Sequence, residues 1–202
     1  MNRVVVINVV GLCDRHIGPD MPFLSAFYER TQHRHIDPAF PAVTCTAQSD
    51  YVTGNTASEH GIVGNGWYNR DLAEVQFWKQ SNQLVQGPKV WDTLRKRHAD
   101  FTFAKVFWWY NMYSSADWSL TPRPMYPADG RKVFDIYTHP VSIRTEIKRD
   151  LGAFPFPGFW GPAAGVTTPQ GSADCVSCWI AESAKWVEQR QSPTLTTIYL
   201  PH

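Results

Sequence analysis

The chain has 202 residues, a mass of 23.0 kDa and a formal net charge of +1, with a pI near 7.7. This near-neutral balance gives no indication of nucleic-acid binding or of attraction to an acidic membrane surface. Aromatic residues make up 14% of the chain, including nine Trp, whereas charged residues reach only 18%. Such a composition excludes disorder and predicts a large buried interior or an extended contact surface.

Residues 4–10 form an almost continuous β-branched run, which predicts a central parallel strand covered on both faces. The run is far too short to cross a membrane and its flanks are not those of a signal peptide, so we expect a cytoplasmic protein. Gly11 ends the strand, at the edge where open α/β sheets hold their active sites. Here the carbonyl oxygen of Asn8 is a candidate metal ligand, although a neutral amide is a weak one. A hydrogen bond from a neighbouring loop to Asn8 is the alternative.

Helical and strand patterns alternate along the rest of the chain. The predicted helices cover residues 22–31, 89–97, 142–151 and 174–191. Further core strands are predicted over 101–109 and 194–200, and residues 65–78 are predicted to form a hairpin or a lid near the site. The alternation predicts an α/β fold with a mainly parallel central sheet sandwiched between helices, in a single domain spanning residues 1–202. Stretches rich in proline and glycine predict loop-rich excursions at about 110–140 and 152–173.

The first and the last of these helices each have a clear apolar stripe. In the first, preceded by Asp20 as its cap, the inward positions are Leu24, Phe27 and Tyr28. In the last, the stripe consists of Val176, Trp179, Ile180, Ala184 and Val187. Both helices are therefore expected to pack against the sheet.

The segment around Thr44 combines an extended lead-in with a short helix. Pro41 excludes a helix over residues 40–43, and Gly54 is a typical helix stop. Thr44 is the predicted N-cap between them, so its hydroxyl lies beside free backbone N–H groups at the positive end of the helix dipole. Such a position suits anion binding, or a nucleophile that attacks an anion. The alternative is that Thr44 only caps its helix.

Three linked motifs carry a family resemblance: Pro-Ala-Val-Thr-Cys at 41–45, Val-Thr-Gly at 52–54 and His-Gly-Ile-Val-Gly-Asn at 60–65. Together they resemble the nucleophile region of the nucleotide pyrophosphatase/phosphodiesterase branch of the alkaline phosphatase superfamily. The resemblance implies that Thr44 is the catalytic nucleophile and a ligand of one of two divalent metal ions, zinc in the first instance. It also implies that Asn65, 21 residues later, contacts the phosphate of a small phosphate-ester substrate. The implied reaction is hydrolysis of a phosphodiester or pyrophosphate through phosphothreonine. His60 is interpreted as a structural residue of its turn.

The sequence also departs from that family. An aspartate is expected immediately before the Gly11-Leu12 pair, where this chain has Val10. The remaining metal ligands of the family follow the strand that matches residues 194–200, so they would lie beyond His202. We therefore expect a fold that resembles the N-terminal part of such an enzyme and is incomplete at its C-terminal side. Little hydrolase activity is expected from the chain alone, together with self-association through an unfinished sheet edge.

Two other functions compete with the hydrolase interpretation. The first is a non-catalytic binding or assembly protein that kept the fold, which Val10 favours. The second makes Cys45 a thiol nucleophile at the same helix start. Cys175 and Cys178 have the spacing of a redox pair or a zinc half-site. A zinc ribbon needs a second pair, however, and a thioredoxin-type site follows a strand, so we expect plain cysteines at a helix start.

Overall fold

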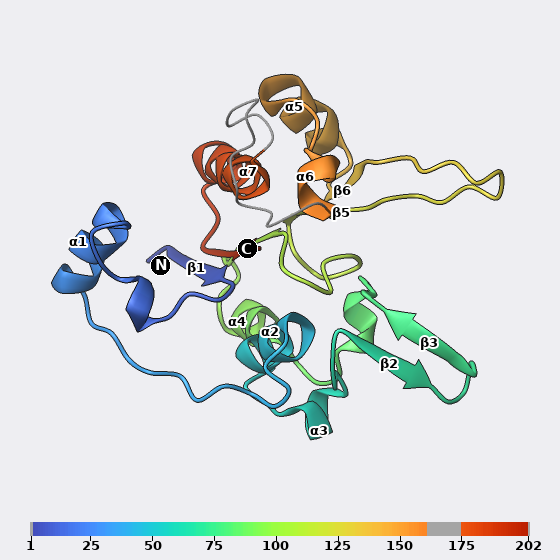
Figure 1. Ribbon diagram of the computed structural model, residues 1–202, viewed down its shortest axis with the longest axis horizontal. Helices are drawn as coiled ribbons and strands as arrows, with labels where there is room; N and C mark the ends of the chain where they lie inside the picture. Colours follow the sequence, from blue (N-terminus) through green and yellow to red (C-terminus); the bar gives the residue numbers. More distant parts are fainter. Residues whose placement is uncertain (1, 161–174, 202) are drawn as a thin grey trace.

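A five-stranded, mostly parallel sheet forms the centre of the molecule (Figure 1). The computed structural model describes residues 2–160 and 175–201. The strand order is β1-β7-β4-β5-β6, with β1, β7, β4 and β5 parallel and β6 antiparallel to β5. The strands of this sheet are β1 (Val4–Val9), β4 (Phe103–Val106), β5 (Trp118–Pro122), β6 (Ile136–His139) and β7 (Leu195–Leu200). The α/β fold class predicted from the sequence is confirmed. A separate hairpin pairs β2 (Gly66–Asn69) with β3 (Glu74–Phe77), as predicted.

Helices cover both faces of the sheet (Figure 1). One face carries α5 (Ser142–Leu151) and α7 (Val176–Gln191), and the other carries α2 (Thr44–Thr53) and α4 (Val90–Arg97). The remaining helices are α1 (Pro22–Arg30), α3 (Ala57–His60), α6 (Phe156–Trp160) and two short 3-10 turns, η1 (Asp14–His16) and η2 (Asn82–Leu84). Among the described helices none has the length and apolar character needed to cross a lipid bilayer.

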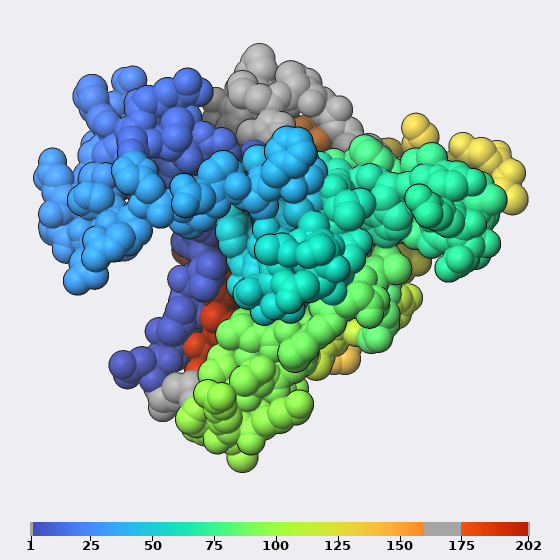
Figure 2. All heavy atoms as spheres, turned by 90° about the horizontal axis from the view of Figure 1, so that it is seen from below, coloured from blue at the N-terminus to red at the C-terminus, as the bar shows by residue number. Residues whose placement is uncertain are grey.

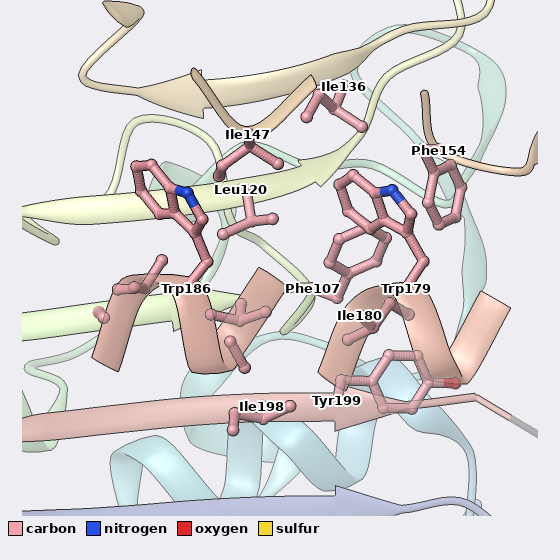
Figure 3. Close-up of a cluster of buried hydrophobic side chains, with 14 of the residues drawn as sticks. Phe107, Leu120, Ile136, Ile147, Phe154, Trp179, Ile180, Trp186, Ile198 and Tyr199 are labelled. Carbon is pink, nitrogen blue, oxygen red and sulfur yellow. The ribbon is translucent and has the colours of Figure 1, made fainter. Parts of the chain in front are cut away.

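The main core lies between α7 and the sheet (Figure 3). All five residues of the stripe predicted in the last helix are buried, with Val176, Ile180 and Val187 at 0% exposure. Trp179 packs edge-on against Phe107, their ring centroids 6.0 Å apart. Each large side chain buried in this way contributes about 1.5–3 kcal/mol, so α7 fixes the sheet that leads to the candidate site.

A smaller core forms under α4 on the opposite face. Trp91 stacks on Phe103 with ring centroids 4.5 Å apart, and both side chains are fully buried. Lys105 of β4 is also buried, with its Nζ donating to the carbonyl oxygen of Tyr110 at 2.6 Å and lying 5.1 Å from the Trp91 ring centroid. The amino group of this lysine therefore has one carbonyl oxygen and one aromatic face as its neighbours.

The prediction that residues 4–10 form a central strand is wrong. Among the described strands β1 occupies an edge and pairs only with β7, and its side chains from Val4 to Ile7 are 40–54% exposed. An apolar groove of about 450 Å³ runs between β1 and the α4 side, and Figure 2 shows red atoms of β7 in this hollow. The β-branched run predicted a strand correctly, but strand order is a property of the tertiary fold that a local pattern does not contain.

The prediction of an inward stripe on the first helix is also wrong. Helix α1 has no buried residue, and Phe27 is 58% exposed. The excursion at 110–140 contains β5 and β6, which the sequence analysis missed because these strands are only five and four residues long. Of the excursion at 152–173, residues 152–160 include the short helix α6, and residues 161–173 lie outside the described part of the chain.

Candidate functional site

Thr44 is the first residue of α2 rather than its cap. Val43, in extended conformation, precedes the helix, and Gly54 ends it in the left-handed conformation with φ of 68°. The N-cap position has no side-chain cap hydrogen bond. Instead the Thr44 hydroxyl lies 3.3 Å from the hydroxyl of Tyr199. The interpretation of Thr44 as a simple helix cap is therefore wrong, since its oxygen points to strand β7.

One cavity brings the three predicted site residues together. It has a volume of about 400 Å³, and Asn8, Thr44 and Asn65 all line it. Gly11 lines it too, so the cavity lies beyond the carboxyl end of β1, where α/β sheets commonly bind ligands. None of the residues that line this cavity is charged. The site therefore offers hydroxyl and amide groups but no cation to neutralise a phosphate.

Asn65 is held against the start of α2. Its Oδ1 accepts the backbone N–H of Cys45 at 2.9 Å, which satisfies one of the N–H groups left free at a helix start. Because Oδ1 already accepts the Cys45 N–H, the Nδ2 group is the part of Asn65 that can donate a hydrogen bond to a phosphate oxygen. Gly66, the next residue, lies so close to Phe77 that a Cβ would meet its ring at 2.1 Å. This close approach of β2 to β3 explains the glycine and fixes the turn that carries Asn65.

Asn8 takes part in a hydrogen-bonded chain that the sequence analysis did not foresee. Its Oδ1 accepts from Gln48 Nε2 at 2.9 Å, and Gln48 Oε1 accepts the backbone N–H of Trp109 at 2.8 Å. Gln48 is 1% exposed, so both ends of its amide need partners. The only sequence signal was a polar residue one turn after Thr44. The carbonyl oxygen proposed as a metal ligand on Asn8 thus already accepts a hydrogen bond.

His60 is a structural histidine in this geometry. Its ring is 0% exposed, Nδ1 accepts the backbone N–H of Ile62 at 3.1 Å, and Nε2 lies 2.5 Å from Asp50 Oδ1. Since Nδ1 is an acceptor, the proton is on Nε2 and is donated to Asp50. The pair ties α2 to the turn that leads to Asn65.

Tyr199 lies beside Thr44 and, like Gln48, was not foreseen in the sequence analysis. It pairs with Asn8 in the β1–β7 register and is 7% exposed. Burial raises the pKa of its hydroxyl, whereas the hydrogen bond with Thr44 lowers it. Tyr199 is therefore a neutral hydroxyl near neutral pH. It can donate a hydrogen bond to Thr44 or accept one, but it is not a general base.

Cys45 does not fit the thiol-nucleophile hypothesis. The side chain is 0% exposed, and burial raises the pKa of its thiol to about 12. A thiolate, the reactive form of cysteine, is thus disfavoured at neutral pH despite the helix start.

The donors around Thr44 do not fit a pair of divalent ions. The cavity is lined by the oxygen-bearing side chains of Asn8, Tyr51 and Asn65, and the Tyr199 hydroxyl lies beside Thr44; these groups are amides and phenols rather than carboxylates. Zn²⁺ takes imidazole, thiolate or carboxylate ligands, and harder divalent ions are usually held by at least one carboxylate beside neutral oxygens. Across the described ranges 2–160 and 175–201, no group of three or more His, Cys, Asp or Glu side chains is arranged to hold a metal. Val10, which lines the cavity, contributes no donor in its side chain.

One protein family matches almost the whole chain. The family described as type I phosphodiesterase / nucleotide pyrophosphatase matches residues 4–202. The chain belongs to this family. A search of curated proteins gave no match. The family is one of hydrolases that act on phosphate esters and are generally metal-dependent.

Proposed function

We propose that this chain carries the phosphoryl-accepting part of a phosphodiester or pyrophosphate hydrolase. Thr44 is the nucleophile: its oxygen bonds to phosphorus, the bond to the leaving oxygen breaks, and water later hydrolyses the phosphothreonine. Asn65 contacts the phosphate through Nδ2. One observation carries the proposal, namely that Thr44 and Asn65 share a cavity beyond the end of β1 in a member of the phosphodiesterase family.

The proposal includes low activity of the isolated 202-residue chain. A threonine hydroxyl is a poor nucleophile unless a base or a cation activates it, and phosphoryl transfer needs positive charge at the phosphate oxygens. Two divalent ions, zinc in the first instance, are the activating groups expected from the family resemblance. The neutral donors around the cavity do not supply their ligands. The ligands for such ions are therefore not among the residues that line this cavity.

A gain-of-function variant tests this proposal directly. Val10→Asp places a carboxylate at the carboxyl end of β1, in the cavity that Thr44 lines. We expect this variant to retain Zn²⁺ through desalting, measured by elemental analysis, and Val10→Asp with Thr44→Ala to retain less. The matched control is Val5→Asp, an exposed position earlier on the same strand. Equal Zn²⁺ in all variants would show that Thr44 is not beside a nascent metal site.

Activity assays complement the metal analysis. With an aryl phosphodiester and added Zn²⁺, we expect the unmodified chain to turn over at the background rate. Any turnover gained by Val10→Asp should disappear in the Thr44→Ala background and persist in part with Thr44→Ser, which keeps a hydroxyl. Rapid turnover by the unmodified chain that vanishes in Thr44→Ala would contradict the proposed low activity and support the assignment of Thr44.

The second candidate function is a non-catalytic binding or assembly protein. The uncharged cavity favours it, and so does the open edge of β1, whose apolar side chains are exposed on both faces. We propose self-association through this edge as the form of assembly, because an unpaired strand offers its N–H and C=O groups to another chain. Sedimentation analysis of the chain and of a Val5→Lys variant tests it. A concentration-independent monomer in both would exclude self-association.

A further inference from the structure

Cys175 and Cys178 are joined by a disulfide at the start of α7. The expectation of two plain cysteines is therefore wrong. Cys175 is the N-cap of this 16-residue helix and Cys178 lies in its first turn. The spacing of two intervening residues is that of dithiol–disulfide pairs that exchange with other thiols. It lies far along the chain from Thr44 and has no part in the proposed hydrolysis.

The two cysteines of the disulfide differ in exposure. Cys175 is 3% exposed and is followed by the fully buried Val176, whereas Cys178 is exposed. Thiol–disulfide exchange requires a thiolate to approach one sulfur along the S–S axis, so accessibility selects which sulfur is attacked. Cys178 is therefore the cysteine that is more open to an incoming thiolate.

The buried sulfur has the features of a good leaving group. The backbone N–H of Cys178 donates to Cys175 Sγ at 3.2 Å, and Cys175 occupies the N-cap of α7. Free N–H groups and the positive dipole end stabilise negative charge at a helix start. The Cys178 N–H and the helix start favour a thiolate on Cys175 and oppose the effect of its burial, which disfavours the charged form. Exchange is faster when the leaving thiol is more acidic.

The disulfide closes a loop too small to be an effective structural clamp. Cross-links stabilise chiefly by restricting the unfolded chain, and the effect is least for the shortest loops. Helix α7 is already anchored by its buried stripe, in which Ile180 and Val187 are 0% exposed. The disulfide is therefore expected to stabilise the fold only slightly. Its position at the start of α7, with one exposed cysteine, suits reversible exchange better.

We propose that Cys175–Cys178 is a thiol–disulfide exchange site whose substrate is a dithiol, either a small molecule or a dithiol protein. One thiolate of the dithiol attacks Cys178 Sγ, a new S–S bond forms, and the bond to Cys175 breaks with its electron pair on Cys175 Sγ. The second thiolate of the dithiol then attacks its own mixed disulfide and releases Cys178. The dithiol loses two electrons and becomes a disulfide, and its two protons end on Cys175 and Cys178.

The exchange site is linked to the end of strand β7. Ser177 lies between the two cysteines, and its hydroxyl donates to the carbonyl oxygen of Pro201 at 2.8 Å. Pro201 follows β7, the strand that carries Tyr199. The first turn of α7 and the carboxyl end of β7 are therefore held together by a residue inside the redox motif.

A redox titration of the folded chain tests the proposal. We would use a Cys13→Ser background, because Cys13 is an exposed free thiol whereas Cys45 is buried. After equilibration in mixtures of reduced and oxidised dithiothreitol, thiols are blocked with N-ethylmaleimide and counted by mass. We expect two adducts to appear together, with no loss of circular dichroism. A disulfide that is reduced only when the chain unfolds would overturn the proposal.

Single-cysteine variants test which sulfur is attacked. With glutathione disulfide, the exposed thiol left in Cys175→Ser should form a mixed disulfide about ten-fold faster than the buried thiol left in Cys178→Ser. Circular dichroism establishes that both variants fold. Equal rates in folded variants, or the reverse order, would contradict attack at Cys178.

A comparison of reductants identifies the source of the dithiol. At equal concentrations, faster reduction by a reduced thioredoxin-type protein than by dithiothreitol would indicate a protein substrate. Equal or faster reduction by dithiothreitol would indicate a small dithiol. Failure of both to reduce the folded chain would refute the exchange site.

Discussion

Removing the carboxylate of Asp50 should destabilise the turn that carries Asn65. In the native structure the buried His60 ring donates from Nε2 to Asp50 and accepts from the Ile62 N–H at Nδ1. The histidine cannot shift its proton to Nδ1, because that nitrogen already accepts a hydrogen bond. Asp50→Ala therefore leaves a buried N–H donor without its partner.

The magnitude follows from the cost of one orphaned buried donor, about 1–3 kcal/mol. The Asp50 side chain retains 22% exposure, so water can reach the vacated space and the lower half of this range is expected. For a domain of this size each kcal/mol corresponds to about 2–4 °C in Tm. Asp50→Asn keeps an acceptor oxygen for Nε2–H and should lose less stability than Asp50→Ala.

Urea unfolding followed by Trp fluorescence measures both variants, with Asp71→Ala as an exposed control in the β2–β3 turn. We expect the free energy of unfolding to fall in the order control, Asp50→Asn, Asp50→Ala. If Asp50→Ala were as stable as the control, the hydrogen bond between Asp50 and His60 would not hold this turn, and the reasoning would be refuted.

Three further predictions concern other buried groups. Burial lowers the pKa of Lys105 well below its usual 10.5. Between the folded and the unfolded pKa the unfolded chain binds one more proton, so the free energy of unfolding rises with pH, by at most about 1.4 kcal/mol per pH unit. In urea unfolding at pH 7 to 10, Lys105→Met should remove this rise, whereas the exposed control Lys96→Met should keep it. Iodoacetamide at pH 8 should label Cys13 and spare Cys45 until the chain is denatured, and rapid labelling of Cys45 would revive the thiol hypothesis. Ile180→Ala should cost about 2–5 kcal/mol by creating a cavity under α7, whereas Phe23→Ala, at 91% exposure, should stay within about 0.5 kcal/mol of the unmodified chain.

The sequence predicted the elements whose pattern is local and long. Helix α7 has five apolar positions at helical spacing, and all five are buried because one stripe can only face one way. The family resemblance implied that Thr44 and Asn65 lie together, and both residues line one cavity. In these cases the information lies within a few turns or within one family motif.

The missed features depend on contacts between distant parts of the chain. Gln48 is polar yet buried because Asn8, 40 residues earlier, accepts its amide, and Tyr199 is 155 residues from Thr44. The local sequence pattern around Gln48 or Tyr199 does not indicate which distant residue each side chain contacts. The edge position of β1 was missed for the same reason, since a β-branched run is compatible with either place in a sheet. The disulfide of Cys175 was missed because spacing alone does not distinguish a linked pair from two free thiols.

Strand β1 connects the two competing functions. Its exposed edge and the uncharged cavity lie along the same strand, because Asn8 lines the cavity near the end of β1. A segment that paired in parallel with this edge would direct its own carboxyl end towards the cavity, where parallel strands place their functional side chains. The pairing of one such segment with β1 could therefore extend the sheet and also place charged side chains near Thr44. Bound metal distinguishes the two functions. A hydrolase assembled in this way must gain bound divalent ions together with activity, whereas a scaffold becomes larger without binding metal. Elemental analysis of any assembled form, alongside its sedimentation, decides between them.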